Sequence, residues 1–85
     1  MTIIDVRTES EWNTGHLEGA LHLEWQDILN ISSDIKIDEE IFLYCRSGNR
    51  SGKATKILLE AGYVNAKNAG SIHNASELLS IKIID

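Results

Sequence analysis

The sequence predicts a small α/β domain with a mainly parallel central sheet and helices on both faces. First, short apolar runs typical of strands alternate with segments of helical periodicity, an order that implies parallel pairing through right-handed crossovers. Second, residues 41–45 are continuously apolar, as expected for a strand that is covered on both faces. Third, 85 residues with no proline and no low-complexity stretch suit one compact domain over residues 1–85.

The chain opens with a strand and a helix. Residues 3–6 are suited to a first short strand, and Thr8 and Glu11 follow at the spacing of a capping box. In that motif each of the two side chains accepts a hydrogen bond from the backbone N–H of the other residue at a helix start. We therefore expect a helix to begin here and to end at Gly15.

A second strand and a second helix are predicted next. Residues 20–23 can form a short strand, and three apolar residues at helical spacing predict a helix over residues 24–30. Residues 34–40 are a polar connection to the central strand. Two apolar side chains are expected to anchor this connection to the core, namely Ile35 and Ile37.

The second half of the chain is predicted to add two strands and two helices. The central strand over residues 41–45 is followed, after a loop, by an amphipathic helix over residues 53–61 that Gly62 ends. Residues 65–69 form a fourth strand, and residues 74–79 form a last helix. The tail that follows carries no clear pattern.

The loop of residues 45–51 holds the only cysteine of the chain, Cys45, at the turn from the central strand to the next helix. Gly48 allows backbone angles that other residues resist, so that successive N–H groups can point inward and form an anion-binding concavity. The helix that follows adds the positive end of its dipole at the same place. These surroundings stabilise a thiolate, which is the form of cysteine that attacks electrophiles. We therefore expect Cys45 to be a nucleophile rather than an inert buried thiol.

Positive charge is concentrated around this loop. Residues 41–59 carry four cationic side chains and no acid, although the formal net charge of the chain is −5. A positive site on an acidic body suits a small anion and argues against nucleic acid as a partner, since a general basic face is missing. The residues expected to bind the anion are Arg46, Ser47, Gly48, Asn49 and Arg50.

Three further residues are candidates for a supporting role: Asp5, Arg7 and Ser51. Asp5 and Arg7 follow the first strand, and ligands of parallel sheets bind beyond the carboxyl ends of the strands. A polar pair that braces the strand end and the first helix is nevertheless the favoured interpretation. His22 and His73 have no companion ligands, so we expect no metal site, and no cofactor is expected either.

The remaining features bear on the compartment. A single cysteine excludes an intrachain disulfide. The first residues do not resemble a signal peptide, and the apolar runs are far shorter than a membrane span. We expect a cytoplasmic protein without a membrane partner, or a periplasmic one if a signal peptide has been removed.

Several motifs occur in one order over most of the chain: Asp5-Val6-Arg7, Glu11-Trp12, residues 15–20, the loop 45–51, residues 61–63 and residues 68–70. Together they resemble the single-domain rhodaneses, the small thiosulfate sulfurtransferases. The resemblance implies that Cys45 takes sulfane sulfur from thiosulfate, releases sulfite, and passes the sulfur to cyanide, a thiol or a protein acceptor. It also implies that residues 46–50 form the amide cradle. The sequence departs from the family at Gly70-Ser71, where a second glycine is common.

Two other functions remain open at this point. The signature of cysteine phosphatases separates cysteine from arginine by five residues, whereas four residues separate Cys45 from Arg50. The shorter loop favours a tighter cradle, suited to a sulfur atom rather than a phosphate group. A sulfur-relay or noncatalytic interaction module is the third class, and the intact Cys45 argues against the noncatalytic version.

In the sulfurtransferase reaction the donor thiosulfate is a dianion, so Arg46 or Arg50 is expected to assist the attack.

Overall fold

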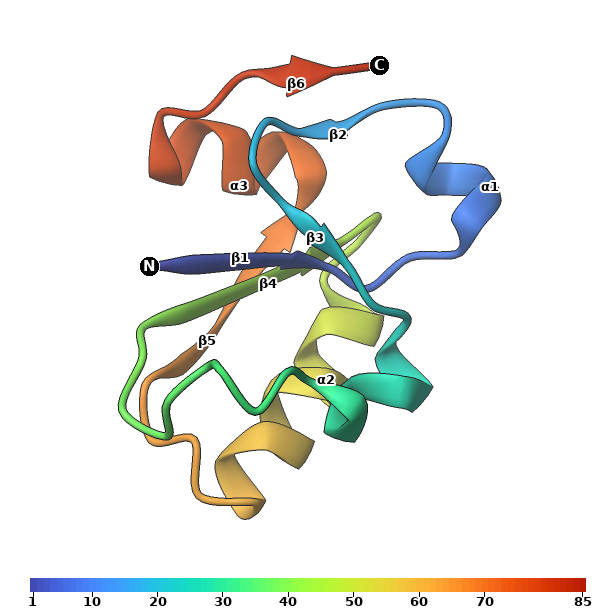
Figure 1. Cartoon of the computed structure of the whole chain (residues 1–85). Coiled ribbons are helices and arrows are strands. Elements are labelled where there is room, and N and C mark those ends of the chain that lie inside the picture. Colours follow the sequence, from blue (N-terminus) through green and yellow to red (C-terminus); the bar gives the residue numbers. More distant parts are fainter.

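The computed structural model describes residues 1–85 and has a central sheet of four parallel strands. They lie in the order β3, β1, β4, β5, with the bounds β1 (Thr2–Asp5), β3 (Leu21–His22), β4 (Ile41–Cys45) and β5 (Ala66–Ser71). A separate antiparallel ribbon joins β2 (His16–Leu17) to β6 (Ile83–Ile84). The predicted α/β class with a parallel central sheet is confirmed (Figure 1).

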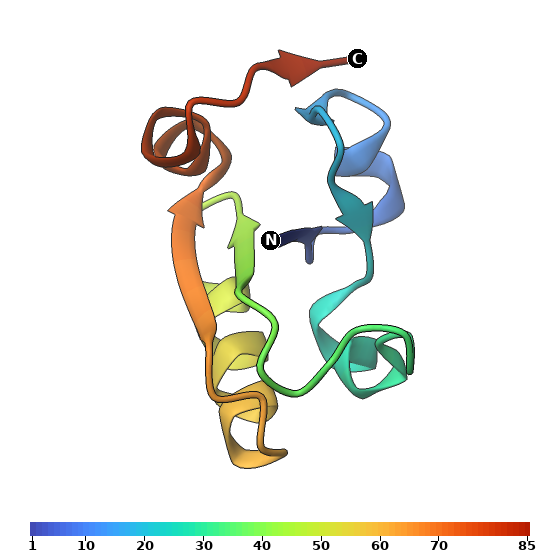
Figure 2. The same ribbon diagram turned by 60° about the vertical axis from the view of Figure 1, so that its left-hand side comes forward.

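Helices cover both faces of the sheet. The α-helix α2 (Asn49–Glu60) and the 3-10 helix η1 (Trp25–Asn30) pack together below the sheet in the view of Figure 1. The helix α3 (Ile72–Leu79) lies above it with the β2–β6 ribbon, and the short α1 (Glu9–Trp12) stands to one side. Figure 2, a rotated view, again shows α2 (yellow) and α3 (dark red) well apart. None of the helices combines the length and the apolar character that a membrane-spanning helix needs.

Each face of the sheet has its own apolar core, because successive side chains of a strand point to opposite faces. In β4, Leu43 belongs to the cluster that includes residues of α2 and η1, whereas Tyr44 belongs to the cluster that includes a residue of α3. In β1, Ile4 and Ile3 divide in the same way. The strand β4 is therefore buried from both sides, which fixes the position of its last residue.

The largest error in the sequence-based boundaries concerns α2, which begins at Asn49 and not at residue 53. Its first turn is polar, so the apolar periodicity becomes visible only one turn later. Gly48, in the left-handed conformation (φ 92°, ψ −8°), is the residue that precedes the helix. Consequently, Ser51 lies in the first turn of α2 and not in a loop.

Other boundaries also differ. The Thr8–Glu11 capping box is confirmed, but α1 ends at Trp12, before Gly15. The ribbon of β2 and β6 was not predicted, because its partners are far apart in the sequence and too short to show a pattern. Of the two anchors expected in the connection before β4, Ile35 packs against the core, whereas Ile37 is 54% exposed.

Candidate active site

Cys45 is the last residue of β4 and has no solvent-exposed surface. Its Sγ accepts two backbone hydrogen bonds, from Gly48 N at 3.0 Å and from Ser51 N at 3.4 Å. The left-handed backbone of Gly48 makes this geometry possible, and a Cβ added there would lie 3.4 Å from the Cα of Gly70. The chain thus turns its amides toward the sulfur at the point where β4 gives way to α2.

The pKa of the Cys45 thiol reflects opposing influences. Burial acts to raise it, whereas the Ser51 hydroxyl, with Oγ 3.3 Å from Sγ, acts to lower it. The backbone amides of Ser51, Ser47 and Gly48 act in the same direction as the hydroxyl. Hydrogen bonds outweigh burial, so the pKa of Cys45 lies below its ordinary value, and the thiolate is favoured.

Asn68, in β5, holds both sides of this loop. Its Oδ1 accepts hydrogen bonds from Ser51 Oγ at 2.7 Å and from Gly70 N at 2.9 Å. Its Nδ2 donates to the carbonyl oxygen of Gly48 at 3.0 Å. The two backbone partners fix the orientation of the carboxamide, which in turn positions the hydroxyl that contacts Cys45.

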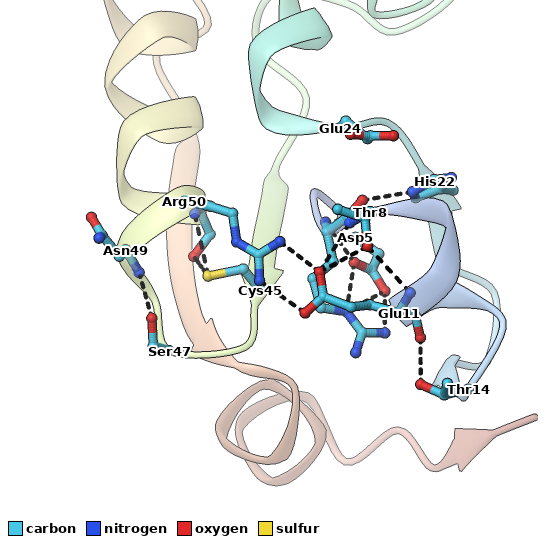
Figure 3. A network of polar contacts seen from close by, with 12 residues as sticks. Asp5, Thr8, Glu11, Thr14, His22, Glu24, Cys45, Ser47, Asn49 and Arg50 are labelled. Carbon is cyan, nitrogen blue, oxygen red and sulfur yellow. Dashed lines mark hydrogen bonds and ion pairs between the residues drawn. The ribbon is translucent and has the colours of Figure 1, made fainter.

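Arg50 is held by Glu11 in a two-pronged ion pair, with Nη1–Oε1 at 2.6 Å and Nη2–Oε2 at 3.0 Å. Figure 3 shows Arg50 between Cys45 and α1. Hydrogen bonding to Arg50 is the main cause that lowers the pKa of Glu11 to about 2. Glu11 Oε1 also accepts from the backbone N–H of Thr8 at 3.1 Å, as part of the capping box. One carboxylate therefore joins the start of α1 to the start of α2.

The other residues of the predicted anion-binding loop are more exposed. Arg46 is exposed and forms no hydrogen bond or ion pair. Ser47 and Asn49 are also exposed, and the Ser47 hydroxyl accepts from Asn49 N at 3.4 Å. Of the two arginines, only Arg46 is thus free to meet an incoming anion without first leaving a partner.

Asp5 and Arg7 form a buried ion pair at the end of β1, with Arg7 Nη2 2.6 Å from Asp5 Oδ2. The same Nη2 donates to the carbonyl oxygen of Gly15 at 2.6 Å. Both side chains of the pair are almost completely buried. These contacts brace the strand end against the segment that follows α1, the role that the sequence favoured for this pair.

Sequence reasoning did not assign a role at this site to Glu11 or Asn68. Glu11 was interpreted as a capping residue, which it is, but its contact with Arg50 spans 39 positions. Asn68 lies in the predicted fourth strand, and the parallel register sets it opposite Leu43, near the end of β4. Polar residues near the ends of neighbouring parallel strands are the pattern from which such a side chain can be predicted.

No three His, Cys, Asp or Glu side chains come together to hold a metal ion.

Comparison with known proteins gives one consistent result. The model of the rhodanese-like domain matches residues 1–75. The thiosulfate sulfurtransferase PspE of Escherichia coli K12 is 31% identical over 71 residues, which cover 81% of this chain and 68% of PspE. The adenylyltransferase and sulfurtransferase UBA4 of Lodderomyces elongisporus is 34% identical, and the match covers 89% of this chain but only 19% of that protein.

Solved structures agree with the fold. A rhodanese with anions from E. coli superimposes with a TM-score of 0.87 at 26% identity, covering 99% of this chain and 96% of the other. The human single-domain sulfurtransferase TSTD1 gives a TM-score of 0.76 at 25% identity, covering 89% of this chain and 80% of the other. The similarity therefore extends from the linear sequence to the arrangement of the whole chain.

Proposed function

The chain belongs to the rhodanese family, and we propose that it is a sulfurtransferase in which residues 1–85 act as one rhodanese-like domain and Cys45 carries the sulfur. The observation that supports this most strongly is the pair of backbone N–H groups, from Gly48 and Ser51, that point at a buried sulfur. Relatives that are sulfurtransferases by name lend the same support. We propose thiosulfate as the donor and cyanide or a thiol as the acceptor, in the cytoplasm.

The proposed first step is an attack of the Cys45 thiolate on the outer sulfur of thiosulfate. A bond forms between Sγ and that sulfur while the bond to the sulfonate group breaks, and the electron pair leaves with sulfite. The product is a Cys45 persulfide whose negative charge lies on the outer sulfur. Amides already aimed at this region stabilise the charge without reorganisation during the reaction. No general base is required, because the nucleophile is a thiolate at the outset.

Access to the sulfur requires a movement in this proposal. Cys45 has no exposed surface, so neighbouring side chains must shift before a donor reaches it. We assign this movement to Arg50, whose guanidinium is released when the donor anion competes with Glu11. Arg46, exposed and without a partner, first attracts the dianion, and Arg50 then holds the departing sulfite.

Mass spectrometry of the intact protein tests the proposal. Thiosulfate should add the mass of one sulfur atom to the wild type, and cyanide should remove it as thiocyanate. Cys45→Ser should abolish both steps, because a hydroxyl is a poor acceptor of sulfane sulfur. Ser10→Ala is the matched control, since Ser10 is an exposed serine of α1 that lies outside the Cys45 loop.

A parallel incubation with a phosphate ester addresses the phosphatase alternative. If the phosphate ester phosphorylates the protein and thiosulfate adds no sulfur to it, the proposed sulfur transfer is wrong and phosphatase chemistry is supported instead. A sulfur adduct that persists in Cys45→Ser would show that Cys45 is not the sulfur carrier.

A further inference from the structure

A groove opens beside the Cys45 loop, at the edge of the sheet where the parallel strands end. Its main cavity has a volume of about 440 Å³ and is lined by Arg7, Glu11, Thr14, Arg46, Ile72 and His73. A second cavity of about 210 Å³ shares four of these residues and extends to Gly15 and Ile83. We call these two adjoining cavities together the α1–α3 groove. It runs from the residue next to Cys45, past the start of α3, to β6.

The groove is larger than the proposed donor requires. Thiosulfate has five non-hydrogen atoms, which at roughly 30 Å³ each, the share of a water molecule in the liquid, occupy about 150 Å³. The main cavity alone is about 440 Å³. There is thus room beside the Cys45 loop for a second and larger molecule.

The charges of the groove select the kind of molecule. Arg7 is neutralised by Asp5, and Glu11 is neutralised by Arg50. Arg46 is the one lining residue whose charge has no partner. The guanidinium is a planar fork that matches a carboxylate with two parallel hydrogen bonds. Apolar surface suited to a short carbon chain comes from Ile72 and Ile83.

We propose that the α1–α3 groove binds the sulfur acceptor, and that this acceptor is a small thiol with a carboxylate that Arg46 holds. The inference rests on the proposed sulfurtransferase function and names the acceptor class for the same site. The acceptor, having lost its thiol proton to solvent, attacks the outer sulfur of the persulfide. A new S–S bond forms, the bond to Sγ breaks, and its electron pair stays on Sγ as thiolate. The acceptor leaves as a persulfide.

Three thiols of similar size test the proposal: 3-mercaptopropionate, which is anionic, 2-mercaptoethanol, which is neutral, and cysteamine, which is cationic. Protein loaded with thiosulfate and freed of it is mixed with each thiol, and loss of the persulfide is followed by mass spectrometry. Each rate constant is compared between variant and wild type, so that the intrinsic reactivity of the thiol cancels. Arg46→Ala should slow 3-mercaptopropionate about tenfold, the effect of one charge-assisted contact, and should leave 2-mercaptoethanol within about twofold.

Charge reversal sharpens the result. Arg46→Glu should slow the anionic thiol further and accelerate cysteamine. Lys56→Ala is the matched control, because Lys56 is an exposed cation on α2 that does not line the groove. Equal slowing of all three thiols in Arg46→Ala, or the same selectivity change in Lys56→Ala, would overturn the assignment of the groove.

A binding measurement separates this inference from the proposed function. In NMR titrations of the unloaded protein, 3-mercaptopropionate should shift the amide signals of Arg46, Ile72 and His73, and Arg46→Ala should abolish these shifts. Failure of thiosulfate to load the protein would contradict the proposed donor chemistry alone. Absence of the amide shifts in the wild type would contradict the groove, whatever the loading experiment gives.

Discussion

Cys45 is a buried thiol whose nearest polar neighbours favour its charged form. Ser51 contributes twice, through its backbone N–H at 3.4 Å and its hydroxyl at 3.3 Å from Sγ. The hydroxyl carries one hydrogen, and two groups compete for it: Asn68 Oδ1 at 2.7 Å and the sulfur. A thiol can donate to Oγ while the hydroxyl donates to Asn68, whereas a thiolate requires the hydroxyl hydrogen for itself.

Replacement of Ser51 by Ala should raise the pKa of Cys45, since one hydrogen bond to the charged form of the sulfur is lost. The fold should persist, because Asn68 Oδ1 keeps its bond from Gly70 N. The rate of alkylation by iodoacetamide as a function of pH measures this change. Ser10→Ala, an exposed serine of α1, serves as control, and an unchanged midpoint in Ser51→Ala would show that the hydroxyl does not stabilise the thiolate.

Sequence reasoning identified contacts between residues that are close in the sequence and missed contacts between residues that are far apart. Cys45, Gly48 and Ser51 lie within seven positions of one another, so their proximity could be expected from the sequence. Arg50 was read as an anion-binding residue, but its charge is already matched by a carboxylate 39 positions away. Asn68 reaches the loop only because β5 pairs with β4. Such contacts depend on the register of the sheet, which local patterns do not specify.

The contact between α1 and α2 links two helices through residues that are 39 positions apart in the sequence. Glu11 caps α1 and neutralises Arg50 in the first turn of α2. Because the pKa of Glu11 is lowered from 4.5 to about 2, this pairing is fully present above pH 4.5 and is lost as the pH falls through about 2. The two helices are therefore joined throughout the physiological range.

Glu11→Gln should release the charge of Arg50 and keep the cap, since Gln also serves in a capping box. A freed guanidinium near Cys45 attracts anions, so alkylation by iodoacetate should accelerate several-fold relative to alkylation by neutral iodoacetamide. In the wild type, Glu11 should add no pH dependence to this ratio between pH 5 and 9. Glu9→Gln makes the same charge change on α1 away from Arg50; if both variants behave alike, the ion pair does not control access.

The boundaries of the elements show which signals are local. The capping box of α1 was predictable because both of its residues lie within one helical turn. The start of α2 was not, because Asn49 to Gly52 carry no apolar periodicity and the helix begins where Gly48 adopts a left-handed conformation. The final helix also begins earlier than predicted, at Ile72, because the Ser71 side chain accepts from Asn74 N and caps it.

The buried Asp5–Arg7 pair connects distant parts of the fold, because it joins the central sheet to the segment that follows α1. Burial acts to lower the pKa of Arg7, but hydrogen bonds and charge attraction from Asp5 raise it above its ordinary value. An ion pair of this kind is costly to break, because removal of one partner leaves an unpaired charge in the interior. We therefore infer that the pair serves mainly the stability of the fold.

Arg7→Met keeps most of the side-chain volume and removes the charge, and should lower the free energy of unfolding by about 3–5 kcal/mol. That is a large share of the roughly 5–15 kcal/mol that stabilises a native domain. Urea denaturation measures it. The double variant Asp5→Asn with Arg7→Met should recover part of the loss, because no charge is left unpaired; a loss below about 1 kcal/mol in Arg7→Met would show that the pair is dispensable.

The ribbon of β2 and β6 has a consequence for the order of events in folding. His16 pairs with Ile84, and Leu17 N donates to the Tyr44 hydroxyl at 3.0 Å, so the ribbon joins the last strand to an early segment and ties both to the central sheet. Contacts between residues so far apart in the chain close a long loop and cost more entropy than local ones. The amides around Cys45, by contrast, come from residues within one short stretch. We therefore expect the loop that carries these amides to take shape early, and the ribbon to be the last part of the molecule to close and the first to open.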